Sequence, residues 1–410
     1  MADIRPFAAY RPVPDLAQRV ASPPYDVLSS DEARVLAADE PHSFLHVVKA
    51  EIDLAPGAPD EEVYERSAAN LQRLIDDGVL VRDAAPSFYV YALTRGDHVQ
   101  YGLAAGCSVD EVASGAIKRH EHTRGDKEDD RARHMQRLGV NAGPVLFTYR
   151  ADPAVRRIID RVRAGTPDTA FVAADGVGHT LWAVSAPADV KALQDAFAGV
   201  DSLYVADGHH RTAAACRTRD FLRDRNPGHT GREPYNHFLA VLFPDDELQL
   251  MGYHRVVADL HGLTPAAFLA RVGEVMDVAP TDRPEPEGHH AWGMFLDGRW
   301  YRVAARPGTF PADDPVRSLD AAVLQELVLG PVLGIGDPRR DPRIDFVGGS
   351  RGTAELERRC GLDMAVAFAF APASVAQIMA VADAGAVMPP KSTWFEPKLR
   401  SGLLVRSLTD

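Results

Sequence analysis

Hydrophobic and polar positions follow two different periods along this chain, which predicts both helices and strands. Apolar residues recur every three or four positions in 60–80, the spacing of one helix face. Serines followed by acidic residues open 29–38, a pattern typical of a capped helix start. Residues 87–109 instead hold two aromatic and β-branched runs around Gly96 and Asp97, which predicts a β-hairpin.

The middle of the chain alternates between the two patterns. Apolar runs typical of strands, and helical patterns between them, occur in turn at 144–149, 152–164, 178–185, 187–199, 202–207 and 212–225. Such alternation favours an α/β fold, in the wider sense that includes α+β. Residues 238–257 predict a second hairpin around Asp245 and Asp246.

Composition and charge narrow the classes of protein that fit. The chain has 410 residues, of which 46% are hydrophobic and 25% charged, an ordinary globular composition with room for two or three lobes. A net charge of −13 disfavours binding to nucleic acid or to an anionic membrane surface. The sequence contains no long apolar run and no signal-peptide pattern, so we expect a cytoplasmic protein. Three scattered cysteines predict neither a disulfide framework nor a structural zinc site.

The chemically richest segment is Asp207-Gly208-His209-His210-Arg211, which follows an apolar strand and opens an alanine-rich helix. A helix start offers free backbone N–H groups and the positive end of the helix dipole, which together favour phosphate. The glycine allows close approach, and the last two side chains can add donors. The aspartate suits Mg²⁺ binding, orientation of a histidine or proton transfer. The alternative is a helix cap followed by solvated histidines.

This segment also carries a family resemblance. YVADGHHRTAAA resembles the G-x-x-R phosphate-binding signature of the ParB and sulfiredoxin superfamily, although His209 stands where sulfiredoxins have a cysteine. The D-G-H-H-R form is similar to that of the ParB-like free serine kinases. PPYDVLSSDEAR, SFLHVVKAEIDL, RHEHT with DDRARH, VLGI and MPPKSTWFEPKL occur around it in an order that resembles the bacterial family DUF1015.

The resemblance implies a fold and a domain organisation. We expect a ParB/sulfiredoxin-like core at 140–260 that contains the D-G-H-H-R motif. An N-terminal α/β segment at 1–139 would contain R-H-E, and a C-terminal α/β segment at 261–410 would contain the MPPKSTWFEPK loop. Both segments would pack around the core.

The resemblance also implies roles for the charge-rich run KRHEHTRGDKEDDRARH. A kinase needs a base for the acceptor hydroxyl, and Glu121 is the first candidate, with Asp207 as the second. Arg119, His120 and Arg131 are candidates for binding anionic parts of the substrate. The alternative for such a run is a solvated helix face.

The C-terminal motif MPPKSTWFEPKL adds cations and hydroxyl groups beside two aromatic residues. Lys391, Ser392 and Thr393 can close over phosphate, and Lys398 is a candidate substrate-binding cation. The alternative is a loop that is docked by its aromatic side chains and stiffened by its prolines.

Three other segments favour a structural interpretation. Tyr25 and Asp26 follow two prolines and could lie at a pocket rim, but proline pairs fix loops whatever their function. His254 and Arg255 lie on an expected strand, where a half-buried histidine is common. Cys216 falls inside the alanine-rich helix and is expected in the core.

Together these patterns predict a phosphotransferase. It would move a phosphoryl group from ATP, ADP or pyrophosphate, with Mg²⁺, to the hydroxyl of a small metabolite, with free L-serine as the leading acceptor. The alternatives are a nucleotide-binding regulator without kinase activity and a phosphohydrolase that uses water.

Overall fold

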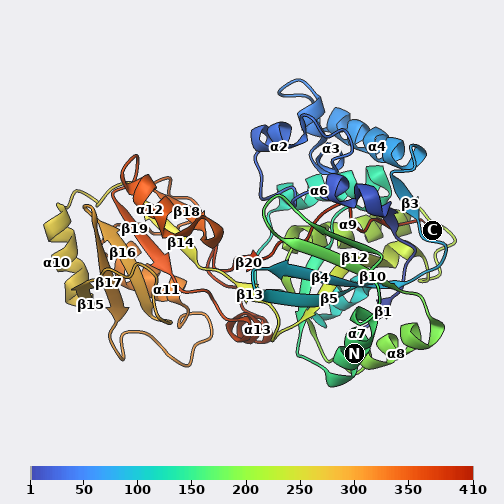
Figure 1. Cartoon of the computed structure of the whole chain (residues 1–410). Helices are drawn as coiled ribbons and strands as arrows, with labels where there is room; N and C mark the ends of the chain where they lie inside the picture. The colour runs from blue at the N-terminus through green and yellow to red at the C-terminus, as the bar shows by residue number, and fades with distance from the viewer. Residues whose placement is uncertain (1, 410) are drawn as a thin grey trace. The chain divides into compact units, whose positions relative to one another are not determined.

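The computed structural model describes residues 2–409, which form two compact units (Figure 1). Unit 1 contains the residues up to Leu248 together with those from Pro397 onward, and unit 2 contains Gln249–Glu396. The expected boundaries, after 139 and after 260, differ from these. The C-terminal residues return to unit 1, where β21 (Arg406–Ser407) pairs with β7 (Val140–Asn141). Local sequence patterns carry no signal for a pairing over so long a separation.

Unit 1 is built on a mixed sheet whose strand order is β6-β11-β8-β12-β5-β4-β10-β9, with β1 also paired to β5. Its strands are β1 (Ile4–Arg5), β4 (Phe88–Arg95), β5 (His98–Ser108), β6 (Ile117–Lys118), β8 (Val145–Tyr149), β9 (Thr169–Val172), β10 (Gly178–Val184), β11 (Leu203–Asp207) and β12 (His237–Pro244). A separate pair joins β2 (Tyr10–Pro12) to β3 (Leu80–Arg82). Parallel and antiparallel neighbours both occur, which confirms the expected mixed α/β class.

Each of the helical ranges predicted in unit 1, namely 29–38, 60–80, 152–164, 187–199 and 212–225, overlaps one helix of the structure, and four further helices occur among the described residues. The helices of unit 1 are α1 (Ala17–Val20), α2 (Ser30–Ala37), α3 (Leu45–Val48), α4 (Asp60–Asp76), α5 (Val109–Ser114), α6 (Gly125–Leu138), α7 (Pro153–Arg163), α8 (Pro187–Phe197) and α9 (His209–Asp224), with 3₁₀ turns at 14–16, 50–53 and 234–236. Ser29 and Glu32 form a reciprocal capping box at α2, as the serine–acid pattern predicts. Helices α7 and α8 bury apolar faces against the sheet in the main core of the unit.

The predicted hairpin at 238–257 is wrong. Strand β12 pairs with β5 and β8 in the sheet of unit 1, whereas β14 (Tyr253–Val257) pairs with β18 and β19 in unit 2. Alternating apolar residues indicate a strand with a buried face, but they do not identify the partner strand. The predicted hairpin at 87–109 is confirmed as β4 and β5, which pair from Tyr89 to Arg95 across the Gly96-Asp97 turn.

Unit 2 contains a second sheet, in the order β15-β17-β16-β19-β14-β18. Its strands are β13 (Gln249–Leu250), β14, β15 (Met276–Pro280), β16 (Ala291–Leu296), β17 (Arg299–Ala305), β18 (Ile344–Gly348), β19 (Val366–Phe370) and β20 (Phe395–Glu396), of which β13 and β20 form a separate pair. Its helices are α10 (Pro265–Val275), α11 (Asp320–Leu324), α12 (Gly352–Cys360) and α13 (Val375–Asp383), with a π-helical turn at 325–329 and a 3₁₀ turn at 349–351.

Helices cover both faces of this second sheet. Phe268 of α10 and Val323 of α11 lie in one apolar cluster with Trp292, while Leu356 of α12 lies in another cluster with Ala367. Successive side chains of a strand point to opposite faces, so one strand can serve both clusters. Within residues 2–409, no helix has both the length and the apolar composition needed to span a membrane.

Candidate functional site

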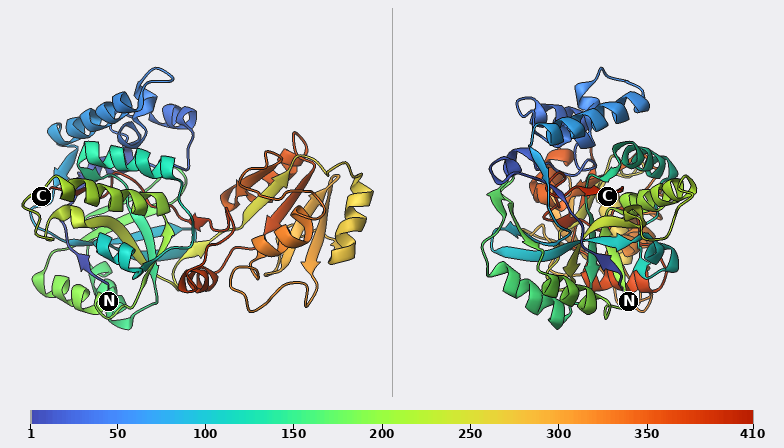
Figure 2. Two further views of the ribbon diagram at one scale, coloured as in Figure 1. Left: turned by 180° about the vertical axis from the view of Figure 1, so that it is seen from behind. Right: turned by 90° about the vertical axis from the view of Figure 1, so that its right-hand side faces the viewer.

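The D-G-H-H-R motif lies where β11 ends and α9 begins, as the sequence predicts. The apolar residues of β11 are buried, and the chain then turns at Gly208, whose φ of 97° is in the left-handed region. A Cβ atom at this position would lie 3.1 Å from Nε and 3.2 Å from Cζ of Arg211. Both the turn and the close approach of the guanidinium therefore require glycine. Helices α6 and α9 lie side by side, as the teal and yellow-green helices of Figure 2 show.

Asp207 lies between two cations. Its Oδ2 is 3.5 Å from Nζ of Lys398 and 3.6 Å from Nη2 of Arg211, and its side chain is 31% exposed. Burial opposes ionisation, but the positive charges of Lys398 and Arg211 prevail and hold the pKa of the carboxyl below its usual range. The aspartate is thus ionised near neutral pH, and the two cations outnumber it. Two cations and the positive end of the helix dipole thus meet at the start of a 16-residue helix.

Two buried polar atoms at this helix start have no hydrogen-bond partner among the described residues. Arg211 is 9% exposed; its Nη1 donates to the carbonyl of Pro144, while its Nε has no acceptor. His209 is 5% exposed, and its Nε2 is also unpaired. An unsatisfied buried group costs about 1–3 kcal/mol, so such atoms usually mark the place of a ligand or an ordered water.

The histidines are neutral near pH 7. The His120 and His209 rings pack edge to face with centroids 4.5 Å apart. Burial lowers the pKa of His120 to about 4 and that of His209 well below its ordinary value. Burial also lowers the pKa of His210, whose Nε2 accepts a hydrogen bond from the backbone N–H of Arg124 at 3.1 Å. The positive charge beside Asp207 therefore comes from Arg211 and Lys398. His210 was expected to be a donor to phosphate, but its ring is neutral and adds no charge.

Glu121 lies in the loop between β6 and α6 and reaches the same site. Its Oε2 is 3.5 Å from Nδ1 of His209, and its side chain is 48% exposed. The carboxylate therefore faces the start of α9 and solvent at once. Arg119, two residues earlier, is exposed, and its predicted substrate contact stays a prediction.

Arg131 belongs to the margin of the site. It forms an ion pair with Asp130 at 2.7 Å, and its guanidinium lies 4.4 Å from the ring centroid of Tyr25. Burial, followed by the charge of Asp26, raises the pKa of Tyr25 to about 12, while Arg211 acts to lower it. The structural interpretation of Tyr25 and Asp26 thus overlooked their closeness to Arg211. Only the proline pair before them hinted at a fixed position.

The residues of the MPPKSTWFEPKL motif divide between the two units. Lys398 belongs to unit 1, whereas Lys391, Ser392 and Thr393 belong to unit 2. Lys391 has its Nζ 5.6 Å from the ring centroid of Tyr253, and the Ser392 hydroxyl donates to the carbonyl of Pro389 at 2.7 Å. The predicted phosphate contacts of these three residues stay a prediction.

The donor set for a metal ion at this site is small. Among residues 2–409, no group of three or more His, Cys, Asp and Glu side chains is arranged to hold a metal ion. Mg²⁺ commonly needs only one or two carboxylates, together with phosphate oxygens and water. The Asp207 carboxylate, which contacts Lys398 and Arg211, is one such candidate ligand at this helix start.

Fold and site together define a mixed α/β protein with a cationic helix start suited to an oxyanion. The chain belongs to the family DUF1015, described as a protein of unknown function, whose model matches residues 4–322. This confirms the family that the sequence motifs indicate. The matched residues include the D-G-H-H-R segment and end before MPPKSTWFEPKL. No curated protein matches the chain.

Several solved structures show a weak likeness to the chain. Free serine kinase in complex with AMP is 12% identical, with a TM-score of 0.37 over 75% of this chain and 91% of that one. A mutant of free serine kinase in complex with ADP is 14% identical, with a TM-score of 0.37 over 76% and 93%. SbnI with a C-terminal truncation from Staphylococcus aureus is 13% identical, with a TM-score of 0.38 over 74% and 87%. Likenesses at these TM-scores carry no argument about this chain.

Proposed function

We propose that this protein is a phosphotransferase that moves a phosphoryl group from a nucleotide or pyrophosphate to the hydroxyl of a small metabolite, with free L-serine as the first acceptor to test. The observation that carries the proposal is the start of α9. There, Arg211 and Lys398 flank the Asp207 carboxylate, and Nε of Arg211 and Nε2 of His209 are buried without partners. Phosphate oxygens would satisfy both the charge and the unpaired atoms. The motif resemblance to ParB-like free serine kinases supports the choice of acceptor.

Glu121 is better suited than Asp207 to be the base. Its carboxylate is half exposed and lies 3.5 Å from His209, so a bound hydroxyl compound can reach it. Asp207 has a lowered pKa and two cationic neighbours, which make it a weak base and a good anchor. In the transfer step, the acceptor oxygen forms a bond to phosphorus as the bond to the leaving phosphate breaks. The hydroxyl proton passes to Glu121, and the leaving oxygen keeps the bonding electrons.

The Asp207 carboxylate would hold Mg²⁺ beside its contacts with Lys398 and Arg211. The ion, when bound, neutralises phosphate oxygens and helps to fix their orientation. The chain's own residues bind and orient the donor: the α9 backbone and Arg211 contact its phosphates. His209 stays neutral and offers a hydrogen bond without adding charge.

Phosphorus NMR of the purified protein tests the proposal. The protein is mixed with Mg²⁺, L-serine and, in turn, ATP, ADP or pyrophosphate, and each mixture is repeated without serine. We expect a phosphoserine signal with at least one donor, and its loss in Arg211→Ala. Arg217→Ala is the matched control, because Arg217 lies on the same helix and pairs with Glu128 and Asp129.

Two other outcomes contradict the proposal. Release of inorganic phosphate at the same rate with and without serine, threonine or homoserine would indicate a phosphohydrolase. Donor resonances that broaden on binding but never convert with any of these acceptors would indicate a nucleotide-binding regulator.

A further inference from the structure

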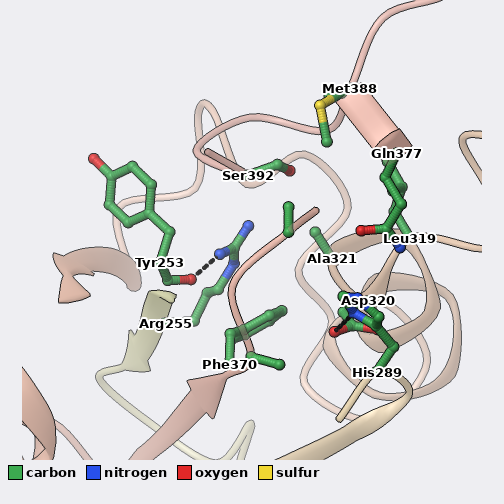
Figure 3. Close-up of a pocket in the computed structure, with 12 residues that line it drawn as sticks. Tyr253, Arg255, His289, Leu319, Asp320, Ala321, Phe370, Gln377, Met388 and Ser392 are labelled. Atoms are coloured by element: carbon green, nitrogen blue, oxygen red, sulfur yellow. Dashed lines mark hydrogen bonds and ion pairs between the residues drawn. The ribbon is translucent and has the colours of Figure 1, made fainter. Parts of the chain in front are cut away.

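Unit 2 contains a small polar cavity that the proposed phosphotransfer does not use (Figure 3). Its volume is about 20 Å³, so only the end of a small polar ligand fits inside it. The polar residues in its lining come from β14, from the MPPKSTWFEPKL motif, from α11 and α13 and from the loop before β16; they are Tyr253, Arg255, His289, Asp320, Gln377 and Ser392. Such a convergence of polar groups on a small space is typical of a binding site for a small polar group.

The central group of this cavity is a buried arginine. Arg255 is 4% exposed, and its guanidinium donates from Nη1 to the carbonyl of Tyr253 and from Nη2 to that of Pro390 at 3.1 Å. The same guanidinium lies 4.3 Å from the ring centroid of Phe370. Across the described part of the chain, no carboxylate lies within ion-pair distance of it. Backbone carbonyls and the rings of Phe346 and Phe370 fix its position. The Asp320 carboxylate acts on its charge only from beyond ion-pair distance.

An unpaired buried charge is costly, because desolvation of an ion is repaid only by a partner of opposite charge. Burial accordingly lowers the pKa of Arg255 to about 9. Arg406 in unit 1 shows that such an arginine alone does not define a site. It is also buried and donates to two backbone carbonyls, of His237 and Pro234, both at 2.7 Å. The distinguishing feature of Arg255 is the polar cavity beside it.

The other polar groups of the cavity limit the kind of anion that fits. Asp320 accepts hydrogen bonds from the His290 backbone at 2.7 Å and from Nδ1 of His289 at 3.2 Å, so it is already satisfied by the protein. Figure 3 shows this pair apart from the Arg255 guanidinium, with Ser392 and Gln377 nearby. A fixed carboxylate in the same lining repels a phosphate dianion more than a monoanion. The small volume also favours a planar group over a tetrahedral one.

We propose that the cavity of unit 2 binds the carboxylate end of a small molecule, with Arg255 as its cation and with the side-chain amide of Gln377 as a hydrogen-bond donor. Carboxylate and guanidinium are both planar and pair with matched geometry, which lysine does not offer. This second anion site is independent of the phosphoryl site at α9. Lys391, whose Nζ is near the ring of Tyr253, adds positive charge at its margin.

Titration of the full chain with sodium acetate tests this proposal. Heat of binding is measured by calorimetry at constant ionic strength, with sodium chloride as the balancing salt. We expect saturable binding with a dissociation constant in the millimolar range, as suits a ligand of four heavy atoms. Arg255→Gln should weaken acetate binding at least tenfold, and Arg217→Ala in unit 1 should leave it unchanged. Inorganic phosphate should displace acetate only at higher concentration.

A second pair of variants keeps the test valid if Arg255→Gln fails to fold. Gln377→Leu removes the amide donor and retains the arginine, so it should weaken acetate binding two- to tenfold. Ser392→Ala should leave acetate binding unchanged, because the Ser392 hydroxyl donates to Pro389. The proposal is overturned if acetate does not saturate, if Arg255→Gln binds acetate as the wild type does, or if Gln377→Leu binds it unchanged. Tighter binding of phosphate than of acetate at this cavity also overturns it.

Discussion

Each unit buries an arginine beside polar groups, but the two units balance its charge in different ways. Arg211 has an acid at 3.6 Å that it shares with Lys398, at a helix start that Glu121 and Asp26 also approach. Arg255 forms no ion pair among the described residues: its guanidinium contacts backbone carbonyls and aromatic rings, and the charge of Asp320 acts on it from farther away. The first arrangement suits a polyanion held by several donors, and the second suits one small monoanion. The ion pairs around each arginine thus distinguish the two proposed anion sites.

The largest effect is expected from the base of unit 1. Glu121→Gln keeps the size of the side chain but removes its ability to accept a proton. Phosphoryl transfer to the acceptor should fall by about 10²–10⁴-fold, with little change in donor affinity. Steady-state rates measured with each donor check this. A fall of less than about threefold would mean that another group takes the proton.

Replacing Arg211 should have the next largest effect. Arg211→Lys retains a positive charge but loses the Nε donor and the contact with Pro144. The dissociation constant of the phosphoryl donor should rise by about 10–100-fold, because charged hydrogen bonds contribute about 1.5–3 kcal/mol each. Arg217→Lys on the same helix is the control. Equal affinities for the two variants would show that Arg211 does not contact phosphate.

The close approach of the Arg211 guanidinium to Gly208 can be tested by the free energy of unfolding. Alanine at position 115 adds a Cβ where φ is 79° and nothing lies within 4 Å, so Gly115→Ala should cost about 1 kcal/mol. Gly208→Ala adds the contact with Arg211 and should cost about 1–2 kcal/mol more. Urea unfolding gives both values. Equal losses would mean that Arg211 moves aside freely.

The smallest expected effect is on the pH dependence of stability, through the contact of Lys398 with Asp207. The lowered pKa of Asp207 adds stability above its unfolded pKa, and this stability is lost as the pH falls through the folded pKa. Below about pH 4 the wild type should therefore lose unfolding free energy more steeply than Lys398→Met, in which one stabilising cation is absent. Unfolding measured at several acidic pH values checks this. Identical slopes would mean that Lys398 does not hold Asp207 ionised.

Local patterns predicted the elements of unit 1 better than their assembly. The capping box of α2, the β4–β5 hairpin and the β11–α9 turn depend on neighbours in sequence, so spacing and turn residues are sufficient to find them. The assignment of β12 and β14 to different sheets depends on distant partners, which periodicity does not encode.

Local sequence also predicted only part of the candidate site. The D-G-H-H-R motif predicts an anion site because its residues are contiguous. Lys398 and Asp207 lie on either side of unit 2 in the sequence. No local pattern predicts that they come together. Arg255 was interpreted as an ordinary strand residue, because the absence of an acidic partner becomes visible only in three dimensions.

The central claim is that donor phosphates bind at the start of α9, and a crystal structure of the full chain with ADP and Mg²⁺ tests it most directly. The account predicts phosphate oxygens within hydrogen-bond distance of Arg211 Nε and His209 Nε2, with Glu121 facing an open acceptor position. Phosphates bound elsewhere in the chain, with these two nitrogen atoms still unpaired or bonded only to water, would contradict it.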